Sequence, residues 1–155
     1  MTDKTAISLA VSVLVGAGIV TYNLPRENFS LTRVIDGDTI ELYVDKMPSP
    51  LPKKLGLRIE GVDTPEKNYL AKCEKERLLG EKATILTQQL LNKSKDTEIT
   101  IRGWGKYGGR VIGDVKLDGR LLSDILIARG LAARYDGTGT KKDWCDGEIP
   151  QKDSE

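Results

Sequence analysis

Apolar and polar residues alternate over several short stretches of the chain, the pattern of half-buried β-strands. The alternation predicts strands over residues 29–35, 40–45 and 55–60, and two more around 99–101 and 111–117. Three prolines between residues 47 and 52 separate the second strand from the third, because proline cannot donate to a sheet ladder. The first half of the chain therefore predicts a β-rich domain.

Two helices are predicted among these strands. In residues 74–92, apolar side chains recur every three or four positions and form one stripe, consisting of Leu79, Ala83, Leu86 and Leu90. Residues 121–129 predict a short helix, and Gly130 follows where a left-handed cap belongs. With a helix inserted after the third of five strands and no βαβ rhythm, the pattern favours an α+β fold, a small closed barrel with two packed helices.

The first 24 residues differ from the rest, since residues 6–20 contain no charge and no polar face. This predicts a signal peptide or an N-terminal membrane anchor within residues 1–24, with membrane attachment through residues 6–22. A helix buried in the core is the alternative. Export would place the folded part outside the cytoplasm, secreted, periplasmic or anchored, where Cys73 and Cys145 could pair; otherwise they are free and buried.

Composition narrows the chemistry. The 155 residues suffice for one domain, and a net charge of +1 argues against nucleic-acid binding by bulk positive charge. The absence of histidine excludes histidine-based acid–base catalysis and most zinc sites, and two cysteines exclude a Cys₄ metal cluster. A catalytic site in this chain would therefore have to use carboxylates, arginines or a hard metal ion.

Acidic residues gather at two predicted turns. Asp36 and Asp38 flank a glycine before the second strand, and Asp63 and Glu66 follow the third strand. If the turns meet at one barrel rim, their oxygens suit calcium, although aspartates are also common turn residues. Arg58 and Arg110 lie on strands, where a guanidinium could grip a phosphate or simply face solvent.

Taken together, these segments resemble the staphylococcal nuclease (thermonuclease) family. The resemblance rests on VIDGDT at residues 34–39, Arg58, VDTPE at 62–66, GEKA at 80–83, KYGGR at 106–110 and the turn at 118–119. It covers residues 29–135 and implies a five-stranded OB-fold barrel. It also implies hydrolysis of phosphodiester bonds in DNA, RNA or both, with one calcium ion.

The resemblance assigns the acidic residues to the metal and to water. Asp38 and Asp63 resemble the family's carboxylate ligands of calcium, and Thr64 resembles the ligand that acts through its backbone carbonyl. Glu66 resembles the residue that activates the attacking water. Asp36 is expected to support the metal site.

The remaining assignments concern the substrate. Arg58 and Arg110 resemble the two arginines that hold the reacting phosphate. Lys106 and Tyr107 resemble residues that bind a nucleotide's terminal phosphate, and Tyr135 resembles a tyrosine near the base. A catalytically inactive OB-fold module that binds nucleic acid or protein is the alternative function.

The predicted organisation is a monomer with a nuclease domain over 25–138 and an irregular tail over 139–155. Three features depart from the family pattern: Gly109 is an extra residue, the approach to Tyr135 is one residue short, and a third, C-terminal helix is expected to be absent. A bridge between Cys73 and Cys145 could take over the stabilising role of that helix.

Overall fold

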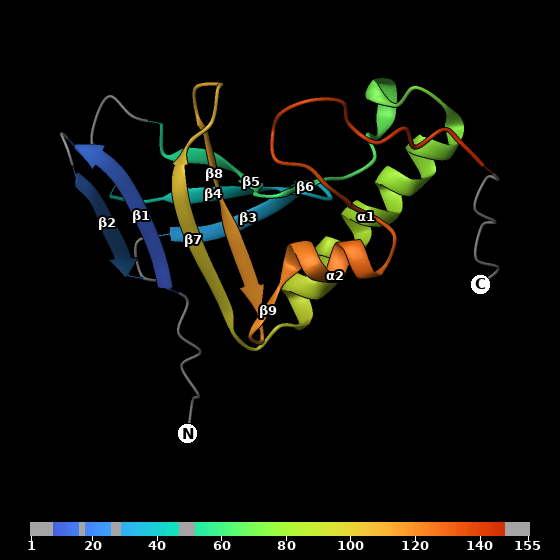
Figure 1. Cartoon of the computed structure of the whole chain (residues 1–155). Helices are drawn as coiled ribbons and strands as arrows, with labels where there is room; N and C mark the ends of the chain where they lie inside the picture. Colours follow the sequence, from blue (N-terminus) through green and yellow to red (C-terminus); the bar gives the residue numbers. More distant parts are fainter. Residues whose placement is uncertain (1–7, 16–17, 26–28, 47–51, 148–155) are drawn as a thin grey trace.

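The five predicted strands are all present and belong to one sheet in the computed structural model, which describes residues 8–15, 18–25, 29–46 and 52–147. They are β3 (Phe29–Asp36), β4 (Thr39–Val44), β5 (Lys54–Ile59), β7 (Thr97–Trp104) and β8 (Arg110–Leu117). Their order is β7-β8-β5-β4-β3, with β5 and β8 parallel. The sheet curls into a half-barrel of OB-fold type (Figure 1), which confirms the predicted α+β class.

The half-barrel is not closed by pairing of its two ends. The outer edge of β7 pairs in parallel with β1 (Ser8–Val15), and β1 forms an antiparallel hairpin with β2 (Gly18–Pro25). A strand has only two edges, and β8 occupies the other edge of β7. No β3–β7 pair therefore exists within the described residues, and the expectation of a fully closed barrel was wrong.

The hairpin lies within the segment predicted as a signal peptide or anchor. It is at the end of the sheet farthest from the helices (Figure 1). No helix among the described residues is long and apolar enough to span a membrane. Export and membrane attachment remain predictions.

Two helices cover the other end of the sheet. The helix α1 (Glu74–Lys93) packs against β3, and the shorter α2 (Leu122–Ala128) packs against β8. The predicted stripe of α1 faces the core: Ala83 is fully buried, and Leu86 and Leu90 pack against the core cluster. After α2, Gly130 has a φ of 69°, so the predicted left-handed cap is confirmed.

Short elements complete the fold. A 3₁₀ turn covers Asn68–Leu70, and β9 (Arg120–Leu121) pairs with β8. The two-residue strands β6 (Val62–Asp63) and β10 (Ala133–Arg134) pair with each other. This last pair brings the chain after α2 back to the turn that follows β5.

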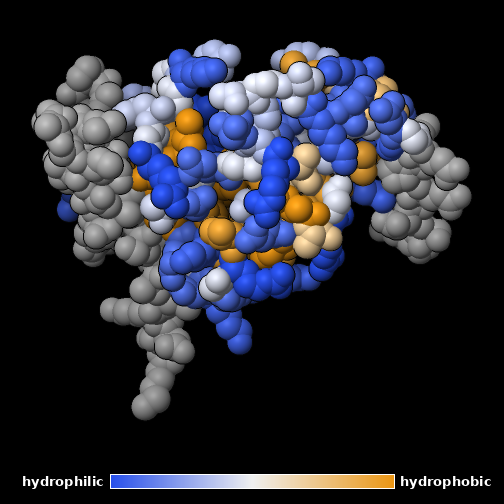
Figure 2. All heavy atoms as spheres, viewed as in Figure 1, coloured by the Kyte–Doolittle hydropathy of each residue, from blue (hydrophilic) through white to orange (hydrophobic). Residues whose placement is uncertain are grey.

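The core is formed by inward-facing strand residues and the apolar side of both helices. Its fully buried members include Ile40, Leu42, Leu57, Ile99 and Leu126. Hydrophilic side chains cover most of the face seen in Figure 2, and hydrophobic ones form a patch near its centre. The alternation in the sequence thus matches burial along the strands.

The chain after β10 forms an irregular strap, defined here as residues 136–147. No helix follows α2 as far as residue 147, and residues 148–155 lie outside the described part. Cys145 forms a disulfide with Cys73, which directly precedes α1, and Trp144 is buried. The strap is therefore irregular in its backbone, but it is attached to the domain.

Deleting residues 1–24 should leave cooperative folding intact, because residues between Ile40 and Ala132 already form a buried apolar core cluster. Thermal melting of the shortened chain should give one transition, shifted by no more than about 5 °C, or roughly 1 kcal/mol. The measurement needs low protein concentration, since the deletion exposes an edge of β7. Loss of the cooperative transition would show that the hairpin is part of the folding unit.

Replacing both cysteines by serine should destabilise the domain. The bridge spans 72 residues, and a loop of this length contributes about 4 kcal/mol in the chain-entropy model. Denaturant unfolding of parent and double variant measures the difference. Two alkylatable thiols in protein taken from its native compartment would contradict the bridge.

Candidate active site

The two acidic turns meet at one end of the half-barrel, as predicted. Antiparallel pairing of β4 and β5 places Arg58 opposite Thr39, beside the turn that carries Asp36 and Asp38. The N–H of Ile59 donates to the carbonyl of Asp38 at 2.8 Å, which holds the turn against β5. The chain then passes into β6, where Asp63 lies.

Arg58 is the centre of a buried ionic cluster. Its guanidinium pairs with Asp38, and its Nη2 lies 3.1 Å from Oδ1 of Asp63 and 3.2 Å from the carbonyl oxygen of Val62. The two carboxylate side chains are only 2% and 5% exposed. Burial lowers the pKa of Arg58 although Asp63 acts to raise it, and the guanidinium stays charged at neutral pH.

Backbone and hydroxyl donors fix Asp38. Its Oδ2 accepts the N–H of Thr64 at 2.8 Å, and its Oδ1 accepts the hydroxyl of Thr39 at 3.1 Å. The bond from Thr64 joins the turn before β4 to the segment after β6. A buried carboxylate needs such partners, because an unpaired charge in the interior is costly.

The helix α1 approaches both turns too closely for larger side chains. A Cβ on Gly37 would lie 2.7 Å from Cβ of Ala83, and a Cβ on Gly80 would lie 2.5 Å from the carbonyl oxygen of Glu66. The hydroxyl of Thr87 also donates to the carbonyl of Gly37 at 2.7 Å. The GEKA segment of the sequence thus fixes the turns rather than contacting a substrate.

Glu76, which the sequence reasoning did not single out, supports Glu66. It is only 5% exposed and lies in the first turn of α1. Its carboxylate accepts the N–H of Lys72 at 2.7 Å and that of Glu66 at 3.4 Å. An acidic residue at a helix N-terminus is ordinary in sequence, so only the fold shows that this one holds the segment carrying Glu66.

A cavity of about 480 Å³ opens at this end of the molecule. It is lined by nine of the predicted site residues: Asp36, Asp38, Arg58, Thr64, Glu66, Lys106, Tyr107, Arg110 and Tyr135. Asp63 lies beside the cavity and contacts two residues of its wall, Arg58 and Lys141. Residues far apart in the sequence therefore form one site.

The β7–β8 connection contributes Lys106, Tyr107 and Arg110. The guanidinium of Arg110 lies 5.6 Å from the ring centre of Tyr107 and pairs with no carboxylate within the described residues. Gly109, the extra residue, has a φ of 78° and accepts the N–H of Gly56 at 2.8 Å. The insertion is thus absorbed in the turn, and Arg110 keeps its place at the start of β8.

Lys141 is a site residue that sequence reasoning missed. Its Nζ lies 2.7 Å from Oδ1 of Asp63, 3.5 Å from Oε1 of Glu66 and 5.9 Å from the ring centre of Tyr135. Partial burial by itself lowers the pKa of Lys141, but the hydrogen bond to Asp63 and the charges of both carboxylates raise it. The sequence of residues 136–147 has no periodicity from which this contact could be predicted. The position of the strap is set instead by the pairing of β10 with β6 and by the disulfide.

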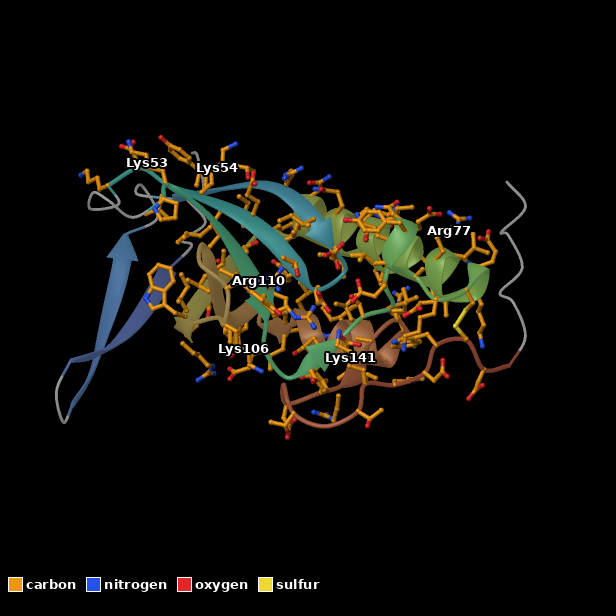
Figure 3. The ribbon with its side chains drawn as sticks, turned by 90° about the horizontal axis from the view of Figure 1, so that it is seen from above. Lys53, Lys54, Arg77, Lys106, Arg110 and Lys141 are labelled. Atoms are coloured by element: carbon orange, nitrogen blue, oxygen red, sulfur yellow. A yellow bond between two sulfur atoms is a disulfide. The ribbon has the colours of Figure 1, made fainter. Side chains whose placement is uncertain are left out.

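Further cations lie near the acidic residues. Lys67, also unforeseen, has its Nζ 3.8 Å from Oδ1 of Asp36. Figure 3 shows Lys106, Arg110 and Lys141 in the same part of the molecule, whereas Lys53, Lys54 and Arg77 lie away from it. Four cationic side chains line the cavity beside its acidic residues: Arg58, Lys106, Arg110 and Lys141.

The donor set fits a hard cation. Asp38, Asp63 and Glu66 supply carboxylate oxygens, and neither nitrogen nor sulfur ligands line the site, which is the preference of calcium. No cluster of three or more acidic, cysteine or histidine side chains arranged to hold a metal occurs among the described residues. A calcium ion here would thus depend on few side chains together with backbone oxygen and water.

A family model described as "Staphylococcal nuclease homologue" matches residues 56–150, which is more than half of the chain. The match includes Arg58, Asp63, Glu66 and Arg110, and it begins after Asp38. The fold and the shared cavity agree with this match. The chain belongs to the family of staphylococcal nuclease homologues.

Proposed function

We propose that this protein is a calcium-dependent nuclease that hydrolyses phosphodiester bonds of DNA, RNA or both. The observation that carries the proposal is the placement of Arg58, Arg110 and Glu66 around one cavity beside two buried aspartates. Membership of the nuclease family supports it. The site chemistry, the metal and the substrate are each open to direct test.

Two arginines can hold the reacting phosphate. They come from the adjacent parallel strands β5 and β8, in which Gly56 is opposite Arg110 and Arg58 is opposite Ile112. Arg110 has no carboxylate partner in the described residues, and the contacts of Arg58 use Nη1 and Nη2 but not Nε. Planar guanidinium groups match phosphate oxygens and stabilise the charge that develops during in-line displacement.

Glu66 is the candidate proton acceptor. Its side chain is 38% exposed and lines the cavity, while its backbone is fixed by Glu76 and by the close approach of Gly80. A carboxylate in this place can orient a water molecule and accept its proton as the water oxygen attacks phosphorus. The chain needs no histidine for this chemistry.

Asp38, Asp63 and the backbone carbonyl of Thr64 are the proposed calcium ligands, with Asp36 in support. When bound, calcium would neutralise charge on the phosphate and on the attacking oxygen. The other predicted substrate residues would contact parts of the nucleic acid next to the reacting phosphate; they are Lys106, Tyr107 and Tyr135. Tyr107 is 69% exposed, which suits contact with a flexible strand.

An inactive binding module is the second candidate. Trp104 at the end of β7 and Tyr107 on the β7–β8 connection are exposed, and OB-fold modules stack bases on such side chains. A module of this kind would not need the arginine pair, the buried aspartates and Glu66 together. The nuclease is therefore the better proposal.

We also propose that the domain works outside the cytoplasm. The uncharged run at residues 6–20 and the Cys73–Cys145 disulfide support this location, because such bridges persist in oxidising compartments. Whether residues 1–24 are removed or retained as an anchor is a question for N-terminal sequencing of protein from its native compartment.

Replacing Arg58 or Arg110 by lysine should lower turnover of single-stranded DNA by about 10²–10³, because lysine keeps the charge but lacks the planar fork. Glu66→Gln should have a similar effect on turnover and leave calcium binding in place. Turnover numbers and thermal melting are measured for each variant.

Arg102→Lys is the matched control. Arg102 is an exposed strand arginine whose Nη2 lies 2.6 Å from Oδ2 of Asp114, outside the cavity lining. Its replacement should leave turnover unchanged and cost no more than about 1 kcal/mol of stability. If folded Arg58→Lys and Arg110→Lys variants cleave as fast as the parent, the site assignment fails and the binding module becomes the better proposal.

Removal of calcium should abolish cleavage. Magnesium demands tight octahedral geometry and releases water reluctantly, so it should support little turnover at a site with few side-chain ligands. Cleavage is followed with calcium, with chelator, and with magnesium plus a calcium-selective chelator. Full activity in the last condition would contradict the proposed ligands.

A further inference from the structure

Lys141 contacts the carboxylates of Asp63, a proposed calcium ligand, and Glu66, the proposed proton acceptor. Its ammonium lies 2.7 Å from Oδ1 of Asp63 and 3.5 Å from Oε1 of Glu66. The same Oδ1 of Asp63 lies 3.1 Å from Nη2 of Arg58. One buried carboxylate oxygen therefore already has two cationic partners, both from this chain.

The fold imposes the position of Lys141. On one side, β10 pairs with β6, and the N–H of Tyr135 donates to the carbonyl of Gly61 at 3.0 Å. On the other side, Trp144 is buried at 5% exposure and Cys145 is bonded to Cys73. The strap thus crosses the site between two fixed points.

Lys142, the next residue, has a different environment. Its Nζ lies 4.2 Å from the ring centre of Trp144, and it takes no part in the cavity lining. The two adjacent lysines therefore lie on the same strap and carry the same charge, but only Lys141 contacts Asp63 and Glu66. This pair provides a control within the chain itself.

We propose that Lys141 is a built-in counter-cation of the calcium site, which the metal must displace from Asp63 and Glu66 in order to bind. The inference rests on the proposed function, since it concerns the same ligands. A calcium ion and an ammonium group at the same carboxylate oxygen repel each other, so calcium binds after the ammonium has moved away. Lys141 therefore sets how much calcium the enzyme needs.

The same contact stabilises the metal-free protein. Asp38 and Asp63 are both buried and share one guanidinium, so the ammonium supplies charge that the cluster otherwise lacks. The exchange of ammonium for calcium would leave the carboxylates paired in both states. A neutral residue at position 141 should then shift the balance towards the metal-bound state.

Calorimetric titration of calcium into the full chain tests this proposal, with parent, Lys141→Gln, Lys141→Arg and Lys142→Gln. Lys141→Gln should bind calcium about tenfold more tightly, an effect reduced from the bare Coulomb value because the lysine is 46% exposed. Lys141→Arg should stay within about threefold of the parent, since the charge is retained. Lys142→Gln should match the parent.

Thermal melting gives a readout that does not depend on activity. Without calcium, Lys141→Gln should melt below the parent, and the difference should shrink or reverse at saturating calcium because the metal binds the folded state. Equal calcium affinities for parent and Lys141→Gln would overturn this inference and leave the nuclease proposal intact. If no variant binds calcium while all remain folded, the metal site of the proposed function fails and this inference fails with it.

Discussion

One partly buried guanidinium connects the two halves of the site. Arg58 pairs with Asp38 from the turn before β4 and with Asp63 in β6, and both carboxylates are almost fully buried. Neither aspartate could remain charged in that place without a partner of opposite sign. The geometry of the turns, and with it the cavity, therefore depends on this ionic cluster. Removing Arg58 alone would leave the buried carboxylate of Asp38 without a cationic partner and Asp63 with Lys141 alone.

The scaffold around the cluster leaves the turns little freedom. The helix α1 approaches through Gly80 and Ala83, and the hydroxyl of Thr87 holds the carbonyl of Gly37. Glu76 holds the backbone that carries Glu66. A site held in this way keeps its charged groups in place before substrate arrives, which is the basis of electrostatic catalysis.

Much of this arrangement could be predicted from the sequence. Alternation along the strands and the stripe on α1 are local patterns, and the order of short motifs identified Arg58, Asp63, Glu66 and Arg110. Lys141 and Glu76 could not be found in that way, because each reaches the site through contacts distant in sequence. Pairing of β1 with β7 was equally invisible, since an uncharged run with two glycines in its second half favours a membrane segment as readily as a hairpin. Gly80 was recognised as part of a motif. The requirement for glycine at this position is steric, and it becomes clear only from the packing of α1 against the segment that carries Glu66.

The central claim is that water, helped by the arginines and Glu66, attacks phosphorus in a nucleic acid. Cleavage of a single-stranded DNA oligonucleotide in water enriched in heavy oxygen tests it most directly, with the products weighed by mass spectrometry. The account predicts calcium-dependent cleavage in which each break adds one heavy oxygen to the phosphate at the new end. Binding of the oligonucleotide without cleavage, or cleavage without incorporation of the label, would contradict it.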